Sequence, residues 1–177
     1  MRRAEIFGVI IDRIEQTQNL ITMEAELSTS INIDNSWGNW GMFSSIDEIT
    51  YYATGIFTTD LSSLSRSNSR SNIILDELEQ IFYFVIERPR VHSITMHLEE
   101  TQFEVNRGFF RFGEVSLTPE EHIALQMQAE NMFRIIMFEE LMTAAYEYTM
   151  SSVHNLLENV LILAGFQDFE IVILWQT

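Results

Sequence analysis

The sequence contains no lysine, and all ten of its basic residues are arginine. Lysine is among the commonest residues of ordinary proteins, so a lysine-free chain of 177 residues is unusual. Its absence excludes Schiff-base chemistry, a lysine general base and the lysine-containing phosphate loop of nucleotide-binding proteins. Three explanations stay open: adaptation to high salt, avoidance of lysine modification inside a foreign cell, and founder composition combined with chance.

Cysteine is also absent, which excludes disulfides, thiolate nucleophiles and cysteine-ligated zinc. Two prolines and seven glycines argue against a loop-dominated architecture. No apolar run approaches the ~20 residues that a membrane-spanning helix needs, and no signal-peptide cleavage pattern follows the first residues. We therefore expect a soluble protein of the cytoplasm, which would be the host cytoplasm or the virion if the source is viral.

The residues that are present describe an acidic, folded chain. Its hydrophobic content of 46% excludes a disordered protein, and its length suits one domain with a sizeable core. The formal net charge is −16. Such a surface repels nucleic-acid phosphates and anionic membranes and attracts basic surfaces. The sequence therefore predicts a protein partner, by self-association or through a basic surface, and neither direct nucleic-acid binding nor membrane binding.

Alternation of apolar and polar residues over 19–33 predicts a long half-buried strand. This strand would form an N-terminal hairpin with residues 5–15, which are rich in β-branched side chains. A third strand is predicted at 48–58, and a mobile polar loop at 62–72. The predicted buried side of the first long strand consists of Ile21, Met23, Ala25, Leu27 and Ile31.

Three helices are predicted, at about 73–87, 119–149 and 152–164. The first rests on an apolar stripe with helical spacing. The second begins with a capping box at Thr118 and Glu121, and the third ends at a glycine. Further strands are predicted at 91–98, 102–106, 109–117 and 169–175. The fold class is thus α+β, with mostly antiparallel sheets in a single compact domain that covers residues 1–177.

Motifs that carry chemistry are missing. There is no His-Glu-x-x-His, no Gly-x-Ser-x-Gly and no Gly-x-Gly-x-x-Gly. We therefore predict no catalytic residues, no cofactor and no metal site. His97, Glu99 and Glu100 fall near one another at the end of a predicted strand, an arrangement that solvated polar residues commonly have. The functional roles of Glu140 and of the four histidines stay open.

Between Met132 and Tyr148, apolar residues nearly encircle the predicted helix at 119–149. Such a helix is either central to its domain or shared with a partner. Glu140 interrupts its stripe, either at the rim or as a buried partner of an arginine. Loop tryptophans would serve as natural interface anchors. The residues predicted to bind a partner are Phe138, Met142 and Tyr146 on the helix, and Trp37 and Trp40 in a loop.

These observations favour a non-catalytic, acidic protein–protein interaction component, either a homo-oligomer or a subunit of a larger assembly. An alternative is an acidic inhibitor or decoy that occupies the basic groove of a nucleic-acid-binding enzyme. The missing lysine suits a viral protein exposed to a hostile cell, and so raises this alternative. A third possibility is a hydrolase that depends on glutamate and histidine.

Overall fold

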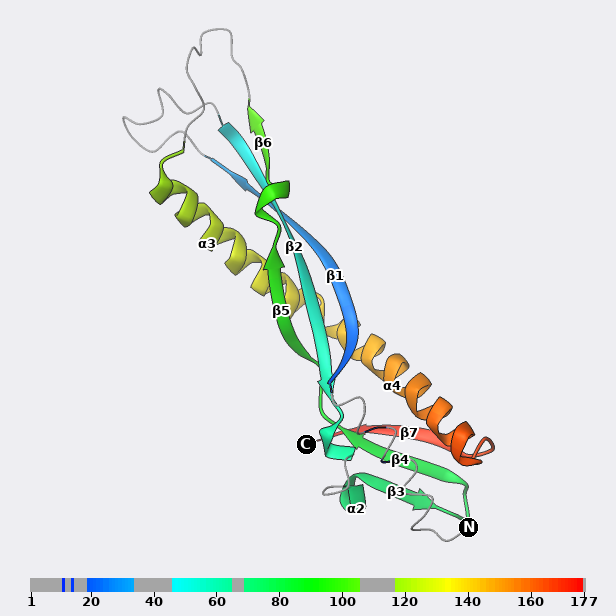
Figure 1. The fold of residues 1–177 in the computed structure, drawn as a ribbon. Coiled ribbons are helices and arrows are strands. Elements are labelled where there is room, and N and C mark those ends of the chain that lie inside the picture. Colours follow the sequence, from blue (N-terminus) through cyan, green and yellow to red (C-terminus); the bar gives the residue numbers. More distant parts are fainter. Residues whose placement is uncertain are drawn as a thin grey trace, which may run out of the picture. The chain divides into compact units, whose positions relative to one another are not determined.

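A computed structural model describes residues 11, 14, 19–33, 46–64, 69–105 and 117–176 of the chain. The chain divides into two compact units (Figure 1). Unit 1 consists of Met1–Glu24, Ile56–His92 and Leu141–Thr177, and unit 2 consists of Ala25–Gly55 and Ser93–Glu140. The chain therefore passes between the units four times. Whether the two units fold together as the single domain predicted from the sequence stays a prediction.

Unit 2 is built on a four-stranded sheet with β2 at its centre. Its strands are β1 (Asn19–Asn32), β2 (Ile46–Asp60), β5 (Arg90–Met96) and β6 (Gln102–Val105), of which β1, β2 and β5 extend into unit 1. β1 pairs with one edge of β2, while β5 and β6 follow one another along the other edge. β6 is antiparallel to β2, with Ile49 opposite Phe103.

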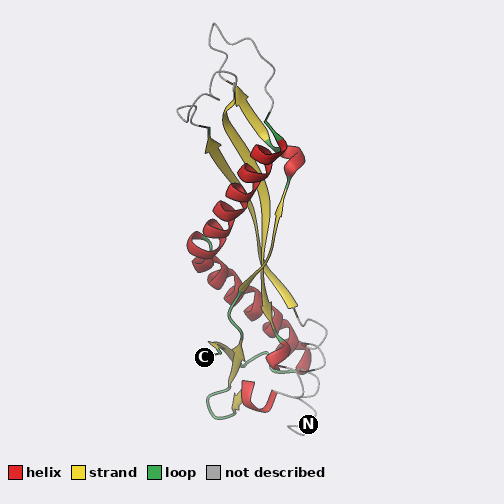
Figure 2. Ribbon diagram, turned by 90° about the vertical axis from the view of Figure 1, so that its left-hand side faces the viewer, coloured by secondary structure: helices red, strands yellow, loops and turns green. Residues whose placement is uncertain are grey.

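A single helical segment covers one face of the unit 2 sheet (Figures 1 and 2). It consists of α3 (Pro119–Ile135) and a π-helical turn, η4 (Ile136–Glu140). The predicted capping box is confirmed, because Thr118 and Glu121 bond to each other's backbone N–H. Buried apolar side chains of both layers form the core: Leu27, Ile31, Ile49, Tyr51 and Ala53 from the strands, and Ala129, Phe133 and Met137 from the helical segment.

Unit 1 contains a three-stranded sheet with the order β3–β4–β7. Its strands are β3 (Ile73–Asp76), β4 (Ile81–Ile86) and β7 (Glu170–Trp175); β3 is antiparallel to β4, and β7 is parallel to it. α4 (Met142–Ala164) packs on this sheet. The core joins Phe82, Phe84 and Ile86 of β4 to Val153, Leu157 and Leu161 of α4. Phe166 and Phe169 surround the ring of Phe82 at centroid distances of 5.5 and 5.4 Å.

The predicted helix at 73–87 is wrong, because these residues form the β3–β4 hairpin. Its β-branched and aromatic residues pack well on a pleated surface. The turn is fixed by Asp76, whose Oδ1 accepts backbone N–H bonds from Leu78 and Glu79 at 3.0 and 3.1 Å. Gln80 completes it with a φ of 58°. Leu78, counted in the apolar stripe of the predicted helix, is 94% exposed at the tip.

The predicted separation of helices 119–149 and 152–164 is also wrong. Helical structure runs from Pro119 to Ala164, interrupted only at Leu141 after the π turn. Ser151 and Ser152, residue types that favour a helix cap before the predicted third helix, lie inside α4. Two long helices and the four-residue α2 (Ser69–Asn72) therefore replace the three predicted helices within the described residues. The α+β class and the mostly antiparallel pairing are confirmed.

The burial of β1 changes sides along the strand. Leu27 and Ile31 are buried as predicted, but Ile21 is 59% exposed and its neighbour Thr22 is buried. Thr22 lies in unit 1, where the hydroxyl of Thr149 donates to Thr22 Oγ1 at 2.9 Å. Since Thr22 and Leu27 are an odd number of residues apart, one uninterrupted alternation cannot bury both. The strand therefore follows two cores, one in each unit.

The remaining sequence predictions have mixed outcomes. The strands at 48–58, 91–98, 102–106 and 169–175 correspond to β2, β5, β6 and β7. Of the predicted strand at 5–15, the described residues Ile11 and Ile14 are helical and buried. The strand at 109–117 lies outside the described residues except for its last residue. In the predicted loop at 62–72, η2 (Ser62–Leu64) and α2 are described, and residues 65–68 lie outside the description.

None of the described helices combines the length and the apolarity that crossing a bilayer requires.

Candidate functional site

The solvent-facing side of α3 carries large apolar residues. Ile123, Met127 and Ile135 are 58%, 61% and 51% exposed, and Phe138 in the following turn is 53% exposed. In a helix, positions three or four apart share a face. The buried residues Ala129, Phe133 and Met137 occupy one face. Met127, Ile135 and Phe138 lie on the far side of the helix from them, and Ile123 lies on its flank. We call Ile123, Met127, Ile135 and Phe138 the outer face of α3.

This outer face lies in a stretch without net charge. Between residues 122 and 138 the only formally charged side chains, with histidine counted as neutral, are Glu130 and Arg134. Their side chains pair with each other, with Arg134 Nη2 donating to Glu130 Oε1 at 2.7 Å. The net formal charge of this stretch is thus zero in a chain whose total is −16. Electrostatic repulsion between two acidic molecules is therefore weakest where such a surface makes the contact.

The π turn sets where the outer face ends. Met137 is fully buried there, and a Cβ atom built on Gly55 of β2 would overlap its Sδ. The absence of a side chain at Gly55 therefore lets the helical segment approach the sheet closely. Phe138, the next residue, is exposed, as are Glu139 and Glu140. π turns occur often at functional positions. The exposure of Glu140 agrees with its interpretation as the rim of the stripe, and not with a buried arginine partner.

The residues predicted to bind a partner are not brought together as one set. Phe138 belongs to unit 2, and Met142 and Tyr146 belong to unit 1. Tyr146 is half-buried and packs edge-to-face on Trp175, with ring centroids 5.3 Å apart. Trp37 and Trp40 lie outside the described residues.

Sequence reasoning missed Ile123 and Met127, which continue the outer face toward the start of α3. The available signal was the four-residue spacing of Ile123 and Met127, followed by Ile135 eight residues further along the helix. The predicted apolar belt extends only from Met132 to Tyr148, and Ile123 and Met127 precede it.

A second uncovered apolar surface lies on the unit 1 sheet. On the face opposite the core, Ile74 of β3 stands beside Tyr83 of β4, which stands beside Val172 of β7. The next row pairs Val85 with Leu174. Ile74 and Leu174 are 49% and 43% exposed, and the others are half-buried. We call this set the outer face of the unit 1 sheet.

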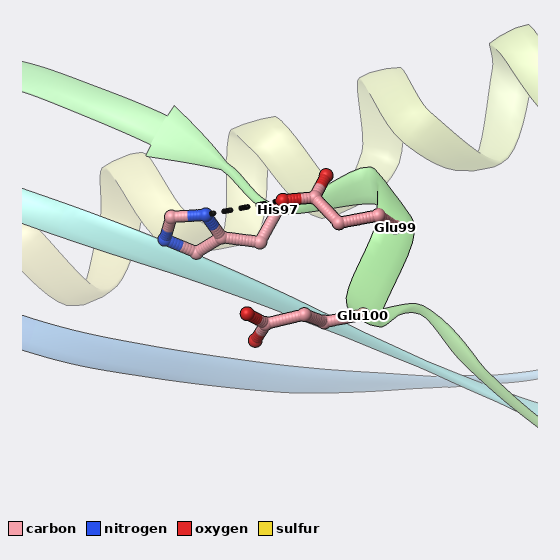
Figure 3. Close-up of side chains that lie close together, drawn as sticks. All are labelled: His97, Glu99 and Glu100. Atoms are coloured by element: carbon pink, nitrogen blue, oxygen red, sulfur yellow. Dashed lines mark ion pairs between the residues drawn. The ribbon is translucent and has the colours of Figure 1, made fainter.

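A cluster of polar groups lies at an edge of the unit 2 sheet, between β5 and β6. The 3₁₀ turn η3 (Leu98–Glu100) follows His97 there, and ligand atoms of His97, Glu99 and Glu100 all lie within 4.8 Å of one another (Figure 3). The His97 Nδ1 atom is 4.0 Å from Glu99 Oε1. On the other side of the ring, Nε2 is 2.7 Å from the hydroxyl oxygen of Thr54 on β2. The structure thus brings together the three residues that the sequence placed at a strand end.

The 3₁₀ turn is an excursion from the sheet edge. The N–H of His97 donates to the carbonyl of Tyr52 at 2.8 Å, and pairing resumes with Gln102 opposite Thr50. Tyr51, which lies between Thr50 and Tyr52 on β2, therefore faces the four residues 98–101 of the edge strand. No side chain of η3 is buried. Such interruptions prevent an exposed edge from pairing with another strand.

The other histidines lie apart from carboxylate pairs of this kind. His122 packs edge-to-face on Phe103 at a centroid distance of 6.4 Å. His92 is exposed at the end of the unit 1 portion of β5. His154 and Glu158, one helical turn apart on α4, border a small open pocket beside Phe166, and both are exposed.

No family model, no curated protein and no solved structure matches this chain. Its function must therefore be argued from the surfaces and clusters described above.

Proposed function

We propose that this chain is a non-catalytic protein–protein interaction component that associates with further copies of itself through the outer face of α3. The observation that carries the proposal is the exposure of Ile123, Met127, Ile135 and Phe138 on the part of the helix surface that its own core does not cover. A helix with apolar residues on both sides is either buried within its domain or shared with a partner, and these four residues are not buried.

Burial of this face would supply the driving force. Complete burial of one large apolar side chain is worth about 1.5–3 kcal/mol relative to full exposure. Each of the four residues is roughly half exposed, so only part of that amount remains to be gained. Methionine and phenylalanine are enriched in the cores of protein interfaces. These contributions must exceed the loss of translational freedom and the repulsion between two acidic chains.

The identity of the partner follows from charge. A basic partner would gain most from the acidic parts of the chain, whereas the outer face of α3 has no net charge. An uncharged apolar surface suits contact with an identical surface related by a two-fold axis. Stable interfaces bury about 1,200–2,000 Å² in total, which exceeds what a single helix face offers. The outer face of the unit 1 sheet is a second surface that an assembly would cover.

The test is a pair of substitutions on exposed positions. Ile123→Glu and Met127→Glu, made together, place two charges on the outer face and should convert an oligomer into a folded monomer. Leu78→Glu is the matched control, because Leu78 is 94% exposed at the tip of the β3–β4 turn and is not one of the residues of the outer face. Molecular mass is measured by light scattering and folding by circular dichroism. An oligomer that persists in the double variant contradicts the proposal.

A further inference from the structure

We infer that His97, Glu99 and Glu100 form a binding site for a divalent transition-metal ion of the zinc type. The ligand atoms would be His97 Nδ1 and one carboxylate oxygen from each glutamate, which already lie within 4.8 Å of one another. This inference is independent of the proposed self-association, since the cluster lies at the sheet edge and uses no residue of the outer face of α3.

The ring of His97 is held from its other side. Thr54 lies in the central strand β2, and its hydroxyl oxygen is 2.7 Å from His97 Nε2. When Nε2–H donates to this oxygen, the lone pair of Nδ1 points toward Glu99. Metal-binding histidines commonly have this arrangement, in which a hydrogen bond to one ring nitrogen orients the other toward the ion. Thr54 would therefore act as a positioning residue.

The spacing between His97 and Glu99 leaves room for an intervening cation. At 4.0 Å, Nδ1 and Glu99 Oε1 are too far apart for a hydrogen bond. Two ligand atoms that are each about 2.1 Å from a zinc ion lie at most about 4.2 Å apart. The gap between these two atoms is within that limit. The three ligand atoms, which lie within 4.8 Å of one another, must move closer together for tetrahedral coordination. The side chain of Glu99, which is 77% exposed, is free to make this movement.

The two carboxylates converge although they repel each other. Glu99 and Glu100 are adjacent in η3, yet both turn toward the ring of His97 (Figure 3). Within the described ranges, neither carboxylate is paired with an arginine. The turn that carries them contributes no buried side chain, so core packing does not explain their placement. A bound cation would neutralise both charges and join the turn to the sheet.

The donor set determines which ions are suitable. Imidazole nitrogen favours zinc and its neighbours among the transition metals, whereas calcium and magnesium favour sites made of oxygen alone. Three protein ligands leave at least one position for water or for a ligand from another molecule. Because both glutamates are exposed, we expect an ion that exchanges with solvent and not a buried structural one.

The experiment is a zinc titration of the full chain by calorimetry, with cobalt absorption as a second readout of the coordination. The wild type should bind one ion. His97→Gln and Glu99→Gln each remove a ligand, so they should weaken binding by more than the roughly tenfold that loss of an outer-shell partner alone costs. Thr54→Val should weaken it less. Glu104→Gln is the control, because it removes the same charge outside the cluster. Glu104 is an exposed glutamate of β6 and lies opposite Glu48.

Each outcome decides the inference. Loss of affinity in the two ligand variants, with the Glu104→Gln protein unchanged, supports it. Equal affinities in all variants would mean diffuse attraction of cations to an acidic chain and overturn it. Absence of saturable binding by the wild type would overturn it as well. Glu99→Gln keeps the test valid if His97→Gln disturbs the fold, because Glu99 makes no contact with the core.

Discussion

The two sheets of the molecule differ in what their second faces carry. In unit 2, β2 buries Ile49, Tyr51 and Ala53 under α3 and presents Thr50, Tyr52 and Thr54 on the other side. In unit 1, β4 buries Phe82, Phe84 and Ile86, while its other side carries Ile81, Tyr83 and Val85. One sheet is thus apolar on one face, and the other is apolar on both.

This difference locates the apolar surface that each unit leaves uncovered. A sheet with one polar face can stand in water, whereas a sheet that is apolar on both faces is normally covered on both. In unit 2 the helix covers the one apolar face of the sheet, and the exposed apolar residues lie on the outside of that helix. Unit 1 leaves them on the sheet itself. The surfaces on which our proposal depends are therefore of two kinds, a helix face and a sheet face.

Removal of a core aromatic from each unit should have the largest effect. Phe82 of unit 1 and Phe133 of unit 2 are both fully buried. Phe82→Ala and Phe133→Ala should each lower the free energy of unfolding by about 3–5 kcal/mol, because a cavity replaces the ring. Chemical denaturation followed by circular dichroism measures this loss. Phe138→Ala, at a half-exposed position, should cost far less and serves as the control.

The same two variants test whether the units are independent. Because the chain passes between them four times, we expect one cooperative transition in the wild type and in both variants. If each substitution instead lowered only one of two separate transitions, the units would be distinct domains and the single-domain prediction would be wrong.

Substitution of Gly55 should have an intermediate effect, confined to unit 2. A methyl group at this position would overlap the buried end of Met137. Gly55→Ala should therefore cost about 1–3 kcal/mol by overpacking. The effects of Gly55→Ala and Met137→Ala should not be additive, since the smaller side chain makes room for the new methyl group. Additive losses in the double variant would show that the close approach is relieved in another way.

A smaller, pH-dependent effect is expected at Tyr51. Its hydroxyl is buried with no hydrogen-bond partner among the described residues, and burial raises its pKa above the ordinary value of 10.0. The unfolded chain therefore releases this proton first, so the contribution to stability is present below about pH 10 and decreases above it. Tyr51→Phe should be neutral or slightly stabilising at pH 7. Denaturation at pH 7 and above pH 10 should show that the variant loses less stability in alkali than the wild type does.

The strands of the unit 2 sheet were readable from the sequence, and in unit 1 the strand β7 was, whereas the β3–β4 hairpin was not. Thr50, Tyr52 and Thr54 alternate with buried residues, and such a period of two has one interpretation. Over 73–87 the apolar residues occupy both faces, so the same letters also fit a helical stripe. In the structure the hairpin is fixed by the turn at Asp76, whose side chain accepts hydrogen bonds from the backbone. The sequence does not reveal this turn, because a helix can accommodate the same residues.

The break in the long helix could not be predicted from local signals. Ser151 and Ser152 are good caps, but they lie inside α4, and the actual interruption follows a π turn at Met137. This turn is placed where Gly55 allows close packing, which is a tertiary contact between distant residues. The proximity of His97, Glu99 and Glu100 was foreseen from their spacing. The orientation of the ring by Thr54 depends on strand pairing and was not.

The most direct test of the proposed function is the molecular mass of the wild-type chain in solution. Light scattering at tens of micromolar protein, in low and in high salt, compares the mass with that of the monomer, 20.7 kDa. We expect at least a dimer, with the oligomeric fraction rising in high salt because the repulsion between chains of formal charge −16 is screened. A mass of one chain under both conditions would contradict self-association through the outer face of α3.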